Sequence, residues 1–372
     1  MQIADANGSA SAATRPRRRV RAFFFNPWAA HVEDAAEYLA RLPGLDLGPL
    51  VANPADPALM AKARLDCDWH GECARCFAAM AEPGLEFLPA QVVGTSGLAD
   101  FAGACPRRPH GEEWWLIFMG QTPQRLEAAA GRLSGFVRQF GVRVLLYAFD
   151  EASRRMPCFR AVAPHLEVLI HDEAPLDPAG AAALRPDCVD LHRSWVANFV
   201  PFSVPFNEAP EEKVLFLGSQ LGLTPHRQRQ LDFLRKRFKD RLVAHHDHSV
   251  SVAARGALNR FKVGFCPEGR MFASPAMSAA HTDRPFWSGC LGLVPVSEDS
   301  RAGGRLEPHH QAALIVRYPH GDLAALAGAC ERALALSLAE RRRIYEHFNR
   351  RETVGTVVAE AIAAAGSGTP SR

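Results

Sequence analysis

Two residues able to do acid–base chemistry follow apolar, strand-like runs in the first half of the chain. Asp150 comes shortly after Val142–Ala148, and His171 directly follows Leu166–Ile170. Open parallel sheets bind ligands beyond the carboxyl ends of their strands, so these side chains are candidate general bases that take a proton from a hydroxyl group. For Asp150 the alternative is a structural role as the N-cap of the helix expected from Ala152.

Groups that suit an anion follow strand-like runs in the second half. The run Lys213–Leu217 leads into Gly218-Ser219 and then into a helix start that carries Arg227. Free N–H groups and the helix dipole at such a start favour a phosphate, although an ordinary strand-to-helix turn has the same local sequence.

Further candidates flank a loop rich in Met, Ser and Ala. Glu268 and Arg270 follow the run Lys262–Cys266, and Arg284 opens the next expected helix. The loop between the two arginines is interpreted either as a segment over a nucleotide or as an ordinary surface loop. A cleft between the two halves would place bases on one wall and anion-binding groups on the other.

Four soft ligands lie within ten residues. Cys67, His70, Cys73 and Cys76 follow the pattern C-x2-H-x2-C-x2-C. They predict either a metal site or idle thiols, because structural zinc sites usually combine two well-separated ligand pairs. The chain has nine cysteines, an odd number, and no apolar export signal. Both features indicate a reducing, cytoplasmic compartment with unpaired thiols.

The composition is that of an ordinary globular protein, with 48% hydrophobic and 22% charged residues. No uncharged apolar run reaches about 18 residues, so no membrane-spanning helix is expected. Residues 23–212 hold 15 Lys and Arg against 25 Asp and Glu, whereas residues 213–270 hold 12 against 4. The basic stretch suits an anionic partner, or is a set of solvated helix faces. A nucleic acid is the least favoured partner, because the acidic half dilutes the basic stretch.

Strand-like and helix-like segments alternate, which is typical of parallel sheets covered on both faces. Prolines between 198 and 210 indicate a joint near residue 205. The sequence predicts a basic disordered tail over 1–19, an α/β domain over 20–205, a second over 206–365 and a disordered tail over 366–372. The main expected strands are 20–25, 114–119, 142–148, 166–170, 213–217, 241–244, 262–266, 291–296 and 314–317.

A series of short motifs follows in order over residues 212–365. They are Val214–Ser219 with Arg227 and Leu231, Lys262–Glu268, His281–Phe286, Gly289 with Gly292 and Pro295-Val296, Ile315–Tyr318 with Asp322-Leu323, and Arg343 with Tyr345. In order and spacing this stretch resembles the second half of GT-B glycosyltransferases. It is most similar to the spore-maturation-type (CgeB-like) family and more distantly to exostosin-type enzymes. The first domain fits the family loosely, through 114–120 and 142–150.

The resemblance implies a GT-B fold, with two tandem Rossmann-like domains facing a central cleft, in a bacterial cytoplasmic enzyme. The second domain would bind a nucleotide-diphosphate sugar as co-substrate, with no other cofactor and no metal. The first would bind the acceptor, which is a small molecule, a glycan or a protein. The nucleoside would lie near Phe265–Gly269, which includes Glu268, and the diphosphate would meet Gly218-Ser219 and one or more of Arg227, Arg270 and Arg284.

One position departs from the family pattern. Many retaining GT-B enzymes carry a Glu three residues after the position of Arg284 and another Glu eight residues before that one, whereas this chain has Trp287 and Ala279. The ribose contact and the stereochemistry therefore stay open. The missing glutamates also fit a protein that binds a nucleotide sugar or a partner without turnover, and the same architecture serves nucleotide-sugar epimerases and hydrolases.

Overall fold

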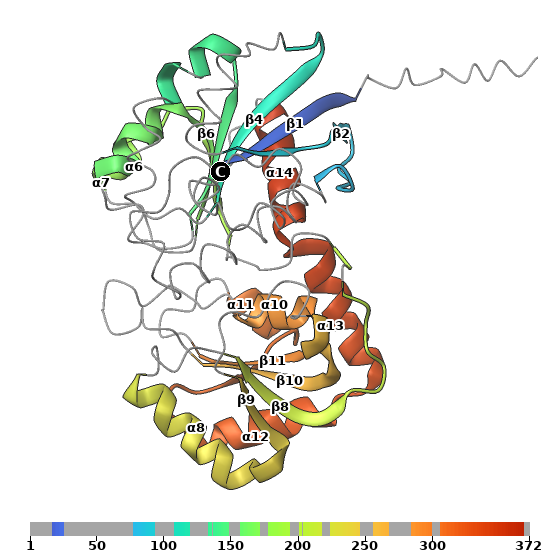
Figure 1. Ribbon diagram of the computed structural model, residues 1–372. Helices are drawn as coiled ribbons and strands as arrows, with labels where there is room; N and C mark the ends of the chain where they lie inside the picture. Colours follow the sequence, from blue (N-terminus) through green and yellow to red (C-terminus); the bar gives the residue numbers. More distant parts are fainter. Residues whose placement is uncertain are drawn as a thin grey trace, which may run out of the picture.

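The structure is a computed structural model of the 372-residue chain. It describes residues 17–25, 77–93, 108–119, 133–135, 137–148, 157–171, 178–193, 201–202, 204–217, 224–245, 256–267, 284–299 and 306–367. The strands form two parallel sheets, the upper and lower parts of Figure 1. The predicted α/β class with two parallel sheets is confirmed.

The first sheet, sheet A, has the strand order β2-β1-β4-β5-β6-β7, and β3 pairs with the second half of β1. All these pairings are parallel. The strands are β1 (Arg18–Phe25), β2 (Leu85–Phe87), β3 (Gln91–Val93), β4 (Glu112–Met119), β5 (Arg143–Tyr147), β6 (Leu166–His171) and β7 (Val189–His192).

The central strand β4 is buried on both faces of sheet A. Leu116 and Phe118 belong to a hydrophobic cluster with Phe159 of α6 (Pro157–Val162), which lies beside α7 (Pro178–Ala183). Trp115 and Ile117 belong to the cluster that includes α14 (Val354–Ser367). A continuous apolar strand is stable because each face has its own helical cover.

The second sheet, sheet B, has the order β12-β11-β10-β8-β9, and all its pairings are parallel. Its strands are β8 (Glu211–Leu217), β9 (Leu242–His245), β10 (Phe261–Cys266), β11 (Val294–Glu298) and β12 (Val316–Tyr318). The direction of strand addition reverses between β8 and β10. Such reversal points are where open α/β sheets bind ligands, beyond the carboxyl ends of the strands.

Helices cover both faces of sheet B (Figure 1). The two on one face, α8 (Pro225–Phe238) and α12 (Leu323–Ala335), have side-chain N-caps, Thr224 and Asp322. The other face carries α10 (Arg284–Cys290), α11 (Leu306–Gln311) and α13 (Leu338–Arg351). In α13, Ser337 and Glu340 form a complete capping box, which satisfies two otherwise unpaired N–H groups. Short 3-10 turns occur at 163–165, 239–241 and 256–260.

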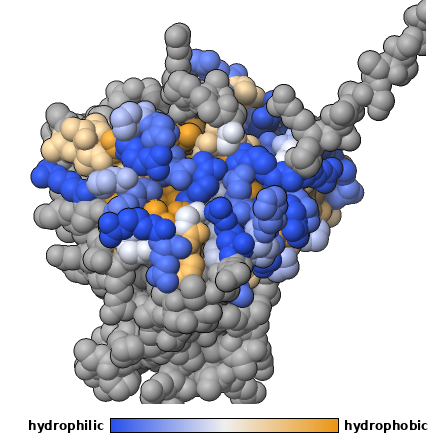
Figure 2. All heavy atoms as spheres, turned by 90° about the horizontal axis from the view of Figure 1, so that it is seen from above, coloured by the Kyte–Doolittle hydropathy of each residue, from blue (hydrophilic) through white to orange (hydrophobic). Residues whose placement is uncertain are grey.

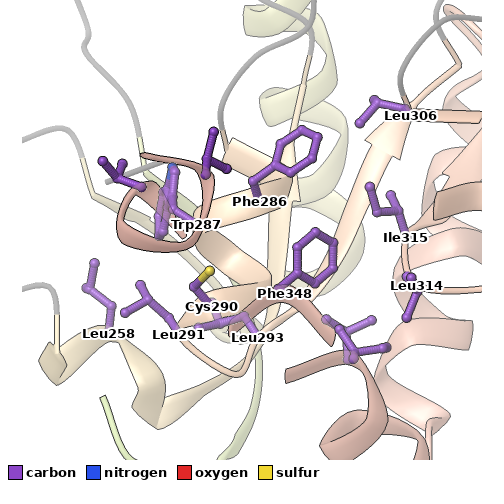
Figure 3. Close-up of a cluster of buried hydrophobic side chains, with 14 of the residues drawn as sticks. Leu258, Phe286, Trp287, Cys290, Leu291, Leu293, Leu306, Leu314, Ile315 and Phe348 are labelled. Atoms are coloured by element: carbon purple, nitrogen blue, oxygen red, sulfur yellow. The ribbon is translucent and has the colours of Figure 1, made fainter. Parts of the chain in front are cut away.

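The helix α10 lies at the centre of the hydrophobic core of sheet B. Phe286, Trp287 and Cys290 point among apolar side chains from neighbouring elements, with Phe348 of α13 facing them (Figure 3). The two helices approach closely at Gly289, where a Cβ would overlap the Phe348 ring. Glycine is therefore required at this contact, because any side chain would push α13 away.

The C-terminal helix α14 packs on sheet A, against β6 and β7, although it follows the elements of sheet B in the chain. Its last turns are held by two guanidinium groups: Arg18 Nη2 donates to Ile362 O at 3.4 Å, and Arg143 Nη2 donates to Ala365 O at 3.0 Å. Cations near the final carbonyls of a helix satisfy unpaired acceptors and oppose its dipole.

The same two arginines belong to a row of alternating charges where the strands of sheet A begin. We call it the charged row; its members are Arg18, Glu113, Arg143, Glu167, Arg185 and Asp187, each in contact with the next. Figure 2 looks onto the end of the molecule that holds sheet A, and hydrophilic side chains cover much of that face. The row links β1, β4, β5 and β6, and through α14 it ties the last part of the chain to sheet A.

Several elements differ from the sequence-based expectation. The strand expected from Val20 begins at Arg18, because Arg18 and Arg19 pair with β2. The last helix, α14, extends to Ser367, past the expected end of the second domain at 365. The edge strand β7 was not predicted, since its four residues, Val-Asp-Leu-His, contain too little apolar sequence. Among the described helices, none is long and apolar enough to cross a membrane.

Candidate functional site

Polar side chains gather at the carboxyl edge of sheet B. Helices that connect parallel strands run back along the sheet, so α8 and α10 both begin at this edge, on opposite faces. The edge therefore carries the start of α8, the start of α10, the end of β11 at Glu298 and the turn after β12.

Glu298 is the centre of a polar cluster at this edge. Its carboxylate has no exposed surface and accepts four close contacts. His226 Nε2 donates to both oxygens at 2.9 and 3.0 Å, Gln230 Nε2 donates to Oε1 at 3.0 Å, and the backbone N–H of Gly321 donates to Oε1 at 2.7 Å. A buried carboxylate needs such donors, since without them its desolvation is unfavourable. Glu298 thereby ties α8 and the turn before α12 to the end of β11.

His226 and His320 form the outer layer of this cluster. Their rings stack with centroids 4.7 Å apart and an interplanar angle of 13°. His320 Nδ1 lies 3.3 Å from Glu298 Oε1. About a quarter of each side chain is exposed, 25% for His226 and 29% for His320. The cluster therefore runs from a buried charge to two imidazoles that solvent reaches.

The atoms of His226, Glu298 and His320 lie within 4.8 Å of one another, as metal ligands would. Their arrangement does not suit an ion. An imidazole binds a metal in the plane of its ring, and two stacked, nearly parallel rings share no such point. In addition, Gln230 Nε2 and the Gly321 N–H point at Glu298 Oε1, and these donors would repel a cation.

A second group of possible ligands, His309, His347 and Glu352, lies between α11 and α13. His309 Nε2 lies 3.1 Å from Glu352 Oε1, and its ring stacks on Phe348. Burial, followed by the charge of His309, lowers the pKa of His347. The group is packed among aromatic rings in the core of sheet B, so it is interpreted as structural.

Three of the described cysteines, Cys188, Cys290 and Cys330, are poor nucleophiles. Burial, the largest effect, raises the pKa of Cys188 and of Cys330 to about 12 and that of Cys290 well above its usual range. A thiol of such pKa is protonated near neutral pH and does not react as a thiolate.

Arg227 and Arg284, both predicted to meet a diphosphate, lie on this edge. Arg284 is the first residue of α10 and is half-buried. Arg227 is in the first turn of α8, where its N–H donates to the Thr224 hydroxyl at 3.2 Å, and its side chain is buried. The structure thus places both arginines at one edge, with Arg284 the more accessible of the two.

His171 ends β6 of sheet A, as the sequence predicts. Its side chain is fully buried, and its Nε2 lies 2.7 Å from Asp190 Oδ1 on the neighbouring strand β7. The carboxylate orients the imidazole, but the ring does not reach solvent in this structure. Its role as a general base stays a prediction.

The other predicted site residues lie outside the described residues. These are Asp150, Gly218, Ser219, Glu268 and Arg270, together with the cluster Cys67, His70, Cys73 and Cys76. Their proposed roles stay predictions.

Trp287 stands where many retaining enzymes of the resembled family hold the donor ribose. Its side chain is 7% exposed and lies in the core with Cys290 and Leu291 (Figure 3). The position is therefore occupied by a packing residue.

Sequence reasoning missed the role of the polar cluster. Nothing in the local sequence joins Glu298 to His226, Gln230 and His320. Glu298 is 72 residues from His226 along the chain. The one available signal was the polar Ser297-Glu298 at the end of an apolar strand.

No family model matches the chain, and no curated protein matches it. Among solved structures, the chain is similar to an α,α-trehalose-phosphate synthase (UDP-forming) from Burkholderia vietnamiensis, with 13% identity and a TM-score of 0.42, over 73% of this chain and 77% of that one. It is also similar to the N-terminal domain of trehalose-6-phosphate phosphatase from Candida albicans, with 8% identity and a TM-score of 0.46, over 95% and 97% of the two chains. The spinosyn rhamnosyltransferase SpnG complexed with thymidine diphosphate is similar with 12% identity and a TM-score of 0.34, over 92% and 99%. At these identities and TM-scores, the similarities carry no conclusion about what this chain does.

Proposed function

We propose that the chain is a glycosyltransferase of GT-B architecture that moves a sugar from a nucleotide-diphosphate donor to a hydroxyl-bearing acceptor. The observation that carries the proposal is the carboxyl edge of sheet B. There the strand order reverses between β8 and β10, and two helix starts from opposite faces bring Arg227 and Arg284 to one edge. Positive groups and helix starts at a reversal point suit a nucleoside diphosphate.

The order of the family-like motifs supports the same reading. Arg284 begins α10, Gly289 allows the close packing of α10 on α13, and Gly292 takes a positive φ of 85° in the turn before β11. These are three of the positions that carry the resemblance in the sequence, and the two glycines have a structural reason in this fold.

The proposed chemistry needs stabilisation of a leaving diphosphate. The acceptor oxygen forms a bond to the anomeric carbon, the bond from that carbon to the phosphate oxygen breaks, and the diphosphate leaves with the electron pair. In the proposed mechanism Arg284 and the helix starts stabilise the developing negative charge without a metal. The acceptor's proton goes to a base, for which Asp150 and His171 are the candidates in the first domain.

A second candidate is a protein of the same architecture that binds a nucleotide sugar without turnover. Two observations favour it: Trp287 is a core residue at the expected ribose contact, and the His171 side chain is fully buried. An epimerase or hydrolase on this architecture is a third candidate that the fold alone does not separate from the others.

Product analysis separates these candidates. The purified protein is incubated with UDP-, TDP- and GDP-linked sugars and with a mixture of sugar, glycan and peptide acceptors. Mass spectrometry then determines the masses of the products. A transferase gives an acceptor heavier by one sugar residue together with free nucleoside diphosphate. Binding of a nucleotide sugar with no product from any acceptor would favour the second candidate, and a changed or free sugar would favour the third.

A further inference from the structure

Three histidines of the described chain share a hydrogen bond with a carboxylate. The pairs are His171 with Asp190, His226 with Glu298 and His309 with Glu352. The side chains of His171 and His309 are buried, whereas a quarter of the His226 side chain is exposed. Of these three pairs, the one formed by His226 and Glu298 therefore joins a fully buried carboxylate to an imidazole that a ligand can reach.

Glu298 determines which nitrogen of His226 carries the proton. A carboxylate only accepts hydrogen bonds, so Nε2, at 2.9 and 3.0 Å from its oxygens, carries the hydrogen. In the neutral ring Nδ1 then holds a lone pair. The other described contacts of His226 are stacking on His320 and the approach of Gln230 Nε2 to His226 Nε2 at 3.1 Å. With the hydrogen on Nε2 these two nitrogens are both donors, and both donate to Glu298 rather than to each other. Nδ1 is the nitrogen left for a ligand, and in this form it accepts a hydrogen bond.

The rest of the cluster holds this arrangement without help from a ligand. Gln230 and Gly321 give Glu298 two further donors, so stabilisation of the buried carboxylate does not depend on His226 alone. His320 stacks on the ring of His226 and limits its rotation. An oriented group of this kind needs little further ordering when a ligand binds, which favours affinity.

We propose that His226 binds a hydroxyl group of the nucleotide sugar through Nδ1, with Glu298 and His320 as positioning residues. The inference rests on the proposed function and adds a recognition residue to it. His226 is the second residue of α8, on the edge where the donor is proposed to bind. A hydroxyl group donates to a neutral Nδ1, whereas a phosphate oxygen, itself an acceptor, is repelled by it. The hydroxyl belongs either to the transferred sugar or to the ribose.

The orientation of His226 is tested without any ligand. In protein labelled with 15N in its imidazoles, the His226 resonances, assigned with His226→Ala, should show the tautomer protonated at Nε2. Glu298→Gln should shift them toward the ordinary tautomer mixture. The matched control is Glu352→Gln, which removes the carboxylate paired with His309 and should leave the His226 resonances in place. His226 resonances that are the same in Glu298→Gln as in the unaltered protein would overturn the positioning role.

The contact itself is tested by calorimetry with UDP-glucose, TDP-glucose, GDP-mannose and the matching nucleoside diphosphates. His226→Ala should weaken binding of the nucleotide sugar about tenfold, as expected for one lost hydrogen bond to a ligand. The control is His110→Ala, an exposed histidine before β4, which should bind normally. If His226→Ala weakens binding of the nucleotide sugar but not of the matching nucleoside diphosphate, the hydroxyl belongs to the sugar. If it weakens binding of UDP by the same factor, and has no effect on binding of 2′-deoxy-UDP, the hydroxyl belongs to the ribose.

Two kinds of result would overturn the inference, and only one of them also overturns the proposed function. The inference is wrong, and the proposed function stands, if the unaltered protein binds a nucleotide sugar and His226→Ala binds it equally well. The same holds if His226→Ala weakens binding of inorganic pyrophosphate as much as binding of the nucleotide sugar. If the unaltered protein binds none of these nucleotides, both are wrong. Should His226→Ala fail to fold, His320→Ala takes its place, and it should weaken the same ligands by a smaller factor.

Discussion

Arg284 is the accessible cation at the start of α10, and its proposed role makes a demanding prediction. A charge-assisted contact that strengthens as the diphosphate leaves contributes a few kcal/mol to the transition state, so Arg284→Ala should lower turnover roughly a hundredfold. Arg284→Lys should recover part of the rate, because an ammonium lacks the two-pronged geometry that phosphate oxygens accept. Steady-state kinetics of the three proteins measures both effects.

Melting curves and a control arginine accompany this comparison. Arg350→Ala removes an exposed arginine of α13 that pairs with Glu346 within the helix, and it should leave turnover unchanged. Arg284→Ala should melt close to the unaltered protein. Near-normal turnover in a stably folded Arg284→Ala would remove this residue from the proposed site.

The residues of the candidate site were predictable from sequence only where they lie next to a strand or open a helix. Arg284 opens α10 and His171 ends β6, as expected, because local spacing decides both. The partnership of His226 with Glu298 was not predictable, since it joins residues 72 positions apart across the carboxyl edge of sheet B. Burial of His171 was equally hidden, because it depends on the short edge strand β7.

The packing of α10 on α13 depends on one glycine. Gly289→Ala should destabilise the fold by about 1–3 kcal/mol, because the new methyl group overlaps the Phe348 ring and the two helices must separate. The matched control is Gly328→Ala in α12, where the nearest atom to the new Cβ is the side-chain Nη1 of Arg332 at 3.5 Å. That change should stabilise the fold by about 0.5–1 kcal/mol, since alanine is the better helix former. Urea unfolding of the two variants should give opposite signs, and equal signs would contradict the packing described here.

The charged row predicts how the stability of the fold depends on pH. Burial alone would raise the pKa of Glu113, but its hydrogen bond to Arg18 and the charges of Arg18 and Arg143 outweigh burial, so the pKa lies below the usual 4.5. A carboxyl group whose pKa is lowered by folding stabilises the fold above its unfolded pKa and loses that contribution as the pH falls through the folded value. The stabilisation by Glu113 is therefore present above about pH 4.5 and is lost below it.

Urea unfolding between pH 7 and pH 3 checks this dependence. Glu113→Gln should be less stable than the unaltered protein at pH 7, and the difference should shrink steadily toward pH 3. The control is Glu331→Gln, which removes an exposed partner of Arg237 and should have little effect at any pH. A Glu113→Gln difference that is the same at pH 7 and pH 3 would show that charge is not what this residue contributes.

Most strands and capped helices were predictable because apolar runs and cap residues are local signals. Thr224 and Asp322 cap α8 and α12, and the run at 114–119 lies within the buried strand β4. The strand order of each sheet and the return of α14 to sheet A were not predictable from such signals. They depend on contacts between distant segments, such as Arg143 with Ala365.

Two parallel sheets, with positive groups on the carboxyl edge of the second, lead to a prediction about metals. The described cluster at this edge has donors and stacked rings where a cation would have to bind. In the proposed mechanism Arg284 takes the place of a metal ion at the diphosphate. Turnover should therefore be unchanged by a chelator. Activity lost on chelation and restored by manganese or magnesium would show that the leaving group is stabilised by an ion instead. Zinc bound to Cys67, His70, Cys73 and Cys76 would not bear on this, because such a site would be structural.

Binding of a nucleotide-diphosphate sugar is the central claim, and a thermal-shift panel tests it most directly. The panel holds uridine, thymidine and guanosine diphosphate sugars, each with and without a divalent metal, and the matching nucleoside monophosphates as controls. At a hundredfold excess over its dissociation constant, the true donor should stabilise the fold by about 2.7 kcal/mol and raise the melting temperature accordingly. The account predicts a shift with at least one diphosphate sugar and a smaller one with its monophosphate. No shift with any member of the full panel would contradict it.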